Sequence, residues 1–114
     1  MIDHIHPGDL AAWIRKVQAH GRPLVLDVRE ASELQQASLR PAADYDLVHI
    51  PMGVVPPRLE ELDPARPVAC LCHHGARSMR VAEFLQHQGF QHVANITGGI
   101  NAWSIQLDPT VPRY

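Results

Sequence analysis

The sequence predicts an α/β fold in which a mainly parallel β-sheet is covered by helices on both faces. Short apolar runs alternate with segments of helical periodicity along the whole chain. These runs are continuous rather than alternating with polar residues, which is typical of strands buried on both faces. The length of 114 residues, with 46% hydrophobic residues, fits one domain spanning residues 1–114 with its own core.

The first predicted element is a helix near the amino terminus. Its apolar residues recur at i, i+3, i+4 and i+7, as one buried helical face requires: Leu10, Trp13, Ile14 and Val17. Asp9 stands at its start, where a carboxylate can accept amide protons, and Gly21 follows its end.

Strands and helices then alternate to the end of the chain. Short apolar runs predict strands at residues 23–28, 47–50, 68–72 and 93–96. Helices are expected at 30–39, before Pro41, at 56–62, and at 77–88, before Gly89. A last helix follows Gly98-Gly99 and carries Ala102 and Trp103. Residues 107–114 hold two prolines and are expected to form an irregular tail.

Composition and charge narrow the class of protein. The net charge is −2 and no Lys/Arg-rich run occurs, so no nucleic-acid partner is expected. The apolar runs are far shorter than a membrane span, and residues 1–4 do not resemble a secretory signal. The two cysteines, Cys70 and Cys72, are poorly spaced to bridge each other, and free thiols suit a reducing compartment. We therefore expect a soluble cytoplasmic protein without a membrane partner.

The segment from Cys72 to Ser78 is the strongest candidate for a site. It joins a buried strand to a helix in few residues, and ligands of such sheets bind beyond the carboxyl ends of the strands. A tight loop with Gly75 in it can turn its amide groups inward, and the first turn of the next helix adds partial positive charge. An anionic sulfur on Cys72 would be stabilised there, and Arg77 suits a bound oxyanion.

Four pieces of the sequence, in this order, strongly resemble the rhodanese-like family. They are Leu26-Asp27-Val28-Arg29-Glu30, His49-Ile50-Pro51-Met52, Cys72-His73-His74-Gly75-Ala76-Arg77-Ser78 and Gly98-Gly99-Ile100-Asn101-Ala102-Trp103. One departure is that Val48-His49-Ile50-Pro51-Met52-Gly53 matches the family's Gly-His-Ile-Pro-Gly-Ala motif only in part, which leaves residues 37–46 hard to align.

The resemblance implies a five-stranded parallel sheet and a sulfur-transfer cycle that needs no cofactor. A donor such as thiosulfate would give its outer sulfur to Cys72, and cyanide or a thiol would take it. The resemblance implies that Cys72 carries the sulfur and that the Arg77 side chain contacts the donor. It also implies that the sulfur is held by backbone amides of the loop, with Ser78 beside them: those of His73, His74, Gly75, Ala76 and Arg77.

Other polar residues invite both structural and functional interpretations. Asp27 and Arg29 lie at the same edge of the sheet, where a structural salt bridge is favoured over a role in the floor of the site. The side chains of His73 and His74 are expected to point outward and to tune the charge rather than transfer protons. The histidines and cysteines lack zinc-site spacing, so no metal is expected, and Cys70 is interpreted as core packing.

Two alternatives to the enzyme stay open. A carrier that exchanges persulfide sulfur with a partner protein would use the same cysteine. The second alternative is a cysteine-dependent phosphatase or arsenate reductase, in which a similar loop follows the catalytic cysteine. Only four residues separate Cys72 from Arg77, one fewer than in phosphatases of the related dual-specificity type, and the shorter loop favours a single sulfur over a phosphoryl group.

Overall fold

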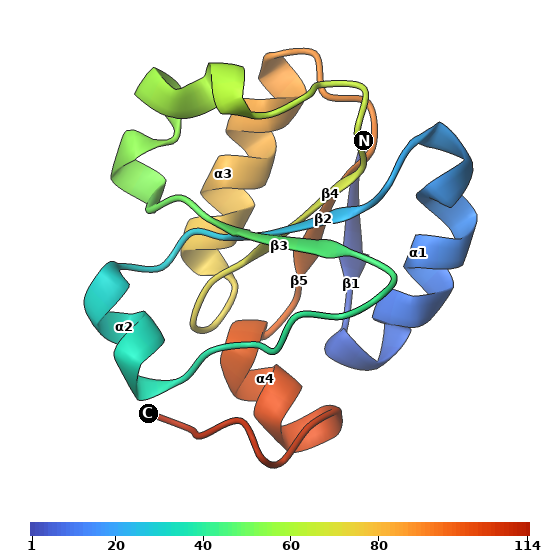
Figure 1. Cartoon of the computed structure of the whole chain (residues 1–114). Coiled ribbons are helices and arrows are strands. Elements are labelled where there is room, and N and C mark those ends of the chain that lie inside the picture. Colours follow the sequence, from blue (N-terminus) through green and yellow to red (C-terminus); the bar gives the residue numbers. More distant parts are fainter.

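The computed structural model describes all of residues 1–114 and contains one five-stranded sheet. The strands are β1 (Ile2–Ile5), β2 (Leu24–Asp27), β3 (Asp46–His49), β4 (Val68–Leu71) and β5 (Val93–Ile96). Their order is β1-β5-β4-β2-β3 and every pairing is parallel, so β4 is the central strand (Figure 1). The predicted fold class is confirmed.

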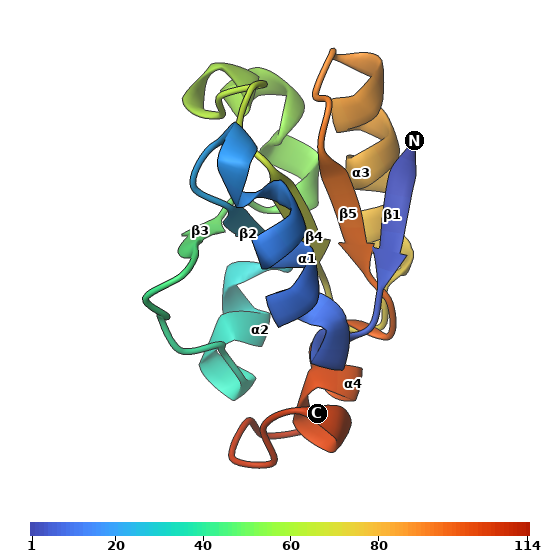
Figure 2. The same cartoon turned by 90° about the vertical axis from the view of Figure 1, so that its right-hand side faces the viewer.

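Helices cover both faces of this sheet. The four α-helices are α1 (Leu10–Val17), α2 (Ala31–Gln36), α3 (Ala76–His87) and α4 (Gly99–Gln106). The core residues of α1 and α4 share one buried cluster and those of α3 belong to the other. In Figure 2, α1 lies on the near side of the sheet and α3 on the far side. None of the helices combines the length and the hydrophobicity that a membrane span requires.

Successive strand residues point to opposite faces, which divides the buried residues between the two clusters. In β4, Ala69 and Leu71 pack with α1 and α4, whereas Val68 and Cys70 pack on the α3 side. Cys72 follows the second set and is buried on the α3 side. This alternation decides which helix the sulfur of Cys72 faces.

The strand β1 was not predicted from the sequence. Ile2 and Ile5 are its only buried residues, and because the polar residues Asp3 and His4 lie between them, the segment contains no apolar run. The strand exists because its backbone pairs with β5, beginning with Ile2 opposite Val93. This long-range pairing supplies the fifth strand of the sheet.

Three local predictions also differ from the structure. The helix expected at 30–39 ends at Gln36, because Ala37 adopts extended backbone angles and is buried in the core. The segment expected as a helix at 56–62 forms 3-10 turns over Pro56–Glu61. Asp9 does not cap α1; its carboxylate accepts a hydrogen bond from the amide of His6 at 3.3 Å, which closes the preceding 3-10 turn.

Candidate active site

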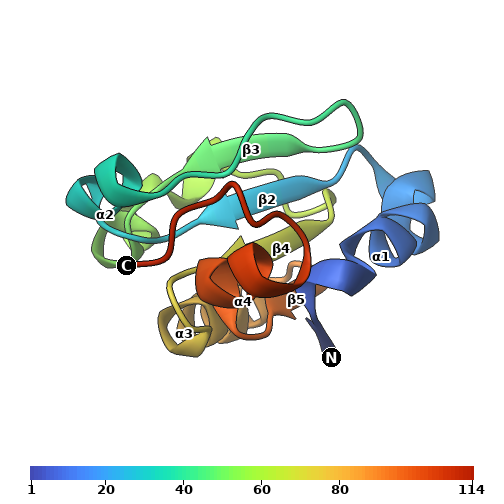
Figure 3. The ribbon, with the colours of Figure 1, turned by 90° about the horizontal axis from the view of Figure 1, so that it is seen from below.

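Cys72 lies directly after the central strand β4, at the carboxyl edge of the sheet. The loop that follows it leads into α3 and lies between α2 and α4 at the lower side of Figure 1. The view from below in Figure 3 shows that α2, α4 and the carboxyl terminus gather at this same end. The exposed fraction of Cys72 is 1%, so its sulfur is covered by the loop and its neighbours.

The sulfur of Cys72 has two polar neighbours. The amide of Gly75 donates a hydrogen bond to Cys72 Sγ at 3.0 Å, and Ser78 Oγ lies 3.3 Å from the same atom. Gly75 has φ 110°, a left-handed conformation that residues with a side chain rarely adopt. The remaining amides of the loop donate to no acceptor in the protein: those of His73, His74, Ala76, Arg77 and Ser78. They remain free to bind an anion.

The Gly98-Gly99 turn holds the carbonyl side of this loop. At the start of α4, the amides of Ile100 and Asn101 donate to the carbonyl oxygens of Cys72 and His73, at 2.9 and 3.1 Å. A Cβ atom on Gly99 would collide with both carbonyl oxygens, so only glycine allows this approach. The sequence marked these glycines through the family resemblance alone, and the close packing gives the physical reason for them.

Ser78 and Asn95 form a buried polar network beneath the sulfur. The Ser78 hydroxyl donates to Asn95 Oδ1 at 2.5 Å, and Asn95 Nδ2 donates to the carbonyl oxygen of Gly75 at 3.2 Å. Sequence reasoning missed Asn95, although a polar residue inside the buried strand β5 was a usable signal. Its position opposite Cys70 in the sheet register places it below the Cys72 loop.

Arg77 is paired with a carboxylate from a different part of the chain. Its Nη1 and Nη2 atoms donate to Glu33 Oε1 and Oε2 at 2.5 and 2.9 Å. The bonds from the guanidinium are the main reason that the pKa of Glu33 lies far below its usual value. Glu33 is the second residue that sequence reasoning missed, because nothing local links α2 to the Cys72 loop.

Asp27 and Arg29 form the salt bridge that the sequence analysis favoured. Arg29 Nη2 donates to Asp27 Oδ2 at 2.7 Å, and both side chains are buried. Arg29 Nη1 also donates to the hydroxyl oxygen of Tyr114 at 3.1 Å. The pair therefore connects the end of β2 to the tail of the chain.

Tyr114 joins several of these groups at the edge of the site. Its hydroxyl donates to Glu33 Oε2 at 2.7 Å, and its ring stacks on His73 with centroids 3.9 Å apart. The segment after residue 106 has no helix or strand, yet this contact ties it to the Cys72 loop. The tail was expected to be irregular, and nothing in its sequence pointed to a place beside the site.

The two loop histidines differ in their surroundings. His74 is exposed, whereas His73 lies between the rings of His74 and Tyr114. Burial is the main reason that the pKa of His73 is lowered, and the charge of His74 acts in the same direction. Nε2 of His73 is enclosed without a hydrogen-bond partner, which favours the neutral ring because a protonated imidazole carries two donors.

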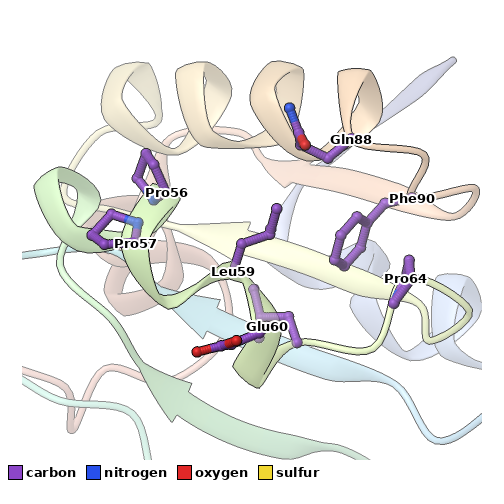
Figure 4. A pocket seen from close by; sticks show the side chains of 8 residues that line it. Pro56, Pro57, Leu59, Glu60, Pro64, Gln88 and Phe90 are labelled. Carbon is purple, nitrogen blue, oxygen red and sulfur yellow. The ribbon is translucent and has the colours of Figure 1, made fainter.

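The largest surface groove lies away from this site. Figure 4 shows its lining by Pro56, Pro57, Leu59, Glu60, Pro64, Gln88 and Phe90. Gln88 follows the carboxyl end of α3, whereas Cys72 lies before its amino end. The groove therefore contributes no group to the sulfur. No group of three or more His, Cys, Asp or Glu side chains is arranged to hold a metal ion.

Fold and site together define an α/β domain with a cysteine-centred loop of unpaired amides at the carboxyl edge of a parallel sheet. The model of the Rhodanese-like domain matches residues 7–106. The chain belongs to the rhodanese-like domain family, as the resemblance of its motifs predicted.

Relatives of known name agree with this assignment. The chain is 43% identical over 91 residues to "Rhodanese-like/PpiC domain-containing protein 12, chloroplastic" of Arabidopsis thaliana, covering 79% of this chain and 30% of that protein. It is 36% identical over 99 residues to "Putative sulfurtransferase YtwF" of Bacillus subtilis, covering 87% of this chain and 90% of that protein.

A sulfur carrier and a solved structure extend the comparison. "Putative sulfur carrier protein YrkF" of Bacillus subtilis is 35% identical over 95 residues, covering 83% of this chain and 49% of that protein. The chain thus spans less than half of two of these three relatives. The crystal structure of a rhodanese-related protein from Thermoplasma volcanium superposes with a TM-score of 0.75 at 29% identity, covering 98% of this chain and 99% of that one.

Proposed function

We propose that the chain is a sulfurtransferase in which Cys72 carries sulfur as a persulfide. The Cys72 thiolate attacks the outer sulfur of a donor such as thiosulfate, the donor's S–S bond breaks, and sulfite leaves with the electron pair. A thiophilic acceptor, cyanide or a thiol, then attacks the outer sulfur of the persulfide and releases the thiolate. The cycle needs no cofactor.

The observation that carries this proposal is the hydrogen bond from the Gly75 amide to Cys72 Sγ at 3.0 Å, in a loop with five unused amides. One amide serves the sulfur of the free enzyme, and the others are available for the added sulfur of a persulfide. Arg77 uses two of its five N–H donors on Glu33 and keeps the rest for an oxyanion of the donor. Asp27 and Arg29 keep a structural role, as the buried salt bridge that connects the end of β2 to the tail.

Mass spectrometry of the intact protein tests this cycle. Incubation with thiosulfate should add the mass of one sulfur atom, and cyanide should remove it with formation of thiocyanate. Cys72→Ser should abolish the gain, whereas Cys70→Ser, the matched control two residues away in the core, should keep it. No gain in the wild type, or an undiminished gain in Cys72→Ser, would reject the proposal.

A persulfide carrier is the second candidate, and the relative named as a sulfur carrier favours it. In this role Cys72 exchanges sulfur with a partner protein and its use of thiosulfate is incidental. Trapping mixed disulfides of Cys72 in a cell extract separates the two roles. Capture of one sulfur-handling protein supports the carrier, and capture of small thiols alone supports the enzyme.

Two further assignments complete the proposal. Both cysteines are free thiols, which fits a reducing compartment, and we assign the chain to the cytoplasm. Turnover of an aryl phosphate that depends on Cys72 would instead establish the phosphatase. The four-residue spacing between Cys72 and Arg77 argues against that reaction.

A further inference from the structure

The charge beside Cys72 is set by the pair of Arg77 and Glu33. Arg77 is the second residue of α3, in the first helical turn after the Cys72 loop. The Glu33 carboxylate holds the Arg77 guanidinium through two hydrogen bonds. Both side chains keep some contact with solvent, with exposed fractions of 33% for Arg77 and 16% for Glu33. The pair thus stands where a dissolved donor approaches.

The Glu33 carboxylate is fixed in place by several donors. Besides Arg77, the hydroxyl of Tyr114 donates to its Oε2 at 2.7 Å and the amide of Glu30 donates to its Oε1 at 3.1 Å. With donors on both oxygens, the negative charge is a permanent part of the site at neutral pH. It offsets the positive charge that Arg77 would otherwise present.

The offset affects donors of different charge unequally. The amides of the Cys72 loop and the first turn of α3 attract any anion through partial charges. Thiosulfate is a dianion, so it feels the carboxylate twice as strongly as a monoanion of the same reacting sulfur. An unpaired Arg77 would attract the dianion more strongly than the monoanion. Because the Arg77–Glu33 pair has no net charge, it removes this preference for the dianion.

We propose that Glu33 is a specificity-determining residue, which shifts donor preference at Cys72 from dianionic thiosulfate toward sulfane-sulfur donors with one negative charge, of the thiosulfonate or persulfide class. This inference rests on the proposed sulfur transfer. Glu33 acts through the charge of Arg77, and the inference requires no contact between Glu33 and the donor.

Two donors that differ by one charge provide the test. With thiosulfate, attack by Cys72 on the outer sulfur releases sulfite; with methanethiosulfonate, the same attack releases methanesulfinate, and both give the Cys72 persulfide. The ratio of kcat/KM for thiosulfate to kcat/KM for methanethiosulfonate is measured at low ionic strength with cyanide as acceptor. Glu33→Gln keeps hydrogen-bonding atoms at this position but removes the charge, and should raise the ratio about tenfold. The rise should shrink as salt is added.

Control variants distinguish a local effect from net charge. Glu83→Gln removes the same charge from an exposed position on α3 and should leave the ratio unchanged. Arg77→Gln removes a donor contact as well as a charge, so it serves only as the background for a double variant. Adding Glu33→Gln to Arg77→Gln should raise the ratio above that of Arg77→Gln alone, and Glu33→Ala, which removes the same carboxylate, replaces Glu33→Gln if that variant does not fold.

The outcomes separate this inference from the proposed function. If neither donor forms a persulfide on the wild type, the sulfur transfer itself is rejected. If both donors form it but the ratio is unchanged in Glu33→Gln, or rises equally in Glu83→Gln, sulfur transfer stands and the role of Glu33 is rejected.

Discussion

The amide of Ile100 donates a hydrogen bond to the carbonyl oxygen of Cys72, with 2.9 Å between nitrogen and oxygen. The start of α4 thereby takes up a carbonyl of the Cys72 loop, and Asn101 does the same for His73. Carbonyl oxygens repel an anionic sulfur, whereas amides attract it. The contact between two segments distant in sequence thus accounts for the polarity of the loop.

Gly99→Ala tests this contact. Gly99 has φ 60°, and an added Cβ would collide with the carbonyl oxygens of Cys72 and His73. The variant should lose about 3 kcal/mol of unfolding free energy, measured by urea denaturation, through overpacking and the left-handed backbone. Gly8→Ala is the control, since nothing lies within 4 Å of its added Cβ. Equal stability of the two variants would contradict the role of the turn.

The two thiols should differ in reactivity. Burial raises the pKa of the Cys70 thiol, so it should stay protonated and unreactive. Iodoacetamide at neutral pH should label Cys72 alone, which peptide mass spectrometry can show. Because the exposed fraction of Cys72 is 1%, labelling also requires that the loop open. Labelling of Cys70, or of neither thiol, would contradict this prediction.

The salt bridge between Asp27 and Arg29 should dominate the stability of this edge of the sheet. Arg29→Met leaves the buried carboxylate of Asp27 without its main partner and should cost about 3–5 kcal/mol. Arg58→Met breaks the exposed pair with Glu61 and should cost far less, because solvent screens an exposed ion pair. Urea denaturation measures the free energy of unfolding of both variants. Similar decreases in the two variants would show that burial of the ion pair does not determine how much its loss destabilises the protein.

His73 should make stability depend on pH. Its pKa is lowered by burial, so the unfolded chain takes up a proton at a higher pH than the folded one. The contribution of His73 to the free energy of unfolding is therefore constant at pH values above about 6.5, the pKa of the imidazole in the unfolded chain. The free energy of unfolding falls as the pH drops below this pKa. NMR titration of the imidazole, assigned with His73→Gln, should give a pKa below about 6.5.

Tyr114→Ala tests whether burial under the Tyr114 ring lowers the pKa of His73. Loss of the stacked ring exposes His73, so its pKa should move up toward the usual value and the fall in stability at low pH should become smaller. An unchanged titration would show that the tyrosine ring does not bury this imidazole.

Much of the architecture followed from local patterns. The continuous apolar runs predicted β2, β4 and β5, and helical spacing predicted α1 and α3, because burial on two faces and burial on one face leave different periodicities. The edge strand β3 was also predicted from a short apolar run, although its residues are only partly buried. β1 escaped because only Ile2 and Ile5 are buried, and α2 was overextended because Ala37 turns into the core. In both cases packing between distant segments overrode the local signal.

The sequence by itself determined the α/β class, the family, and the place of Cys72 after a buried strand, since each depends on residues close together in the chain. Only the tertiary structure decided which groups surround that loop. Glu33 lies 44 residues from Arg77, and Tyr114 lies 85 residues from Arg29. Such pairs form because α2, α4 and the tail pack against one edge of the sheet, and no local pattern encodes that packing.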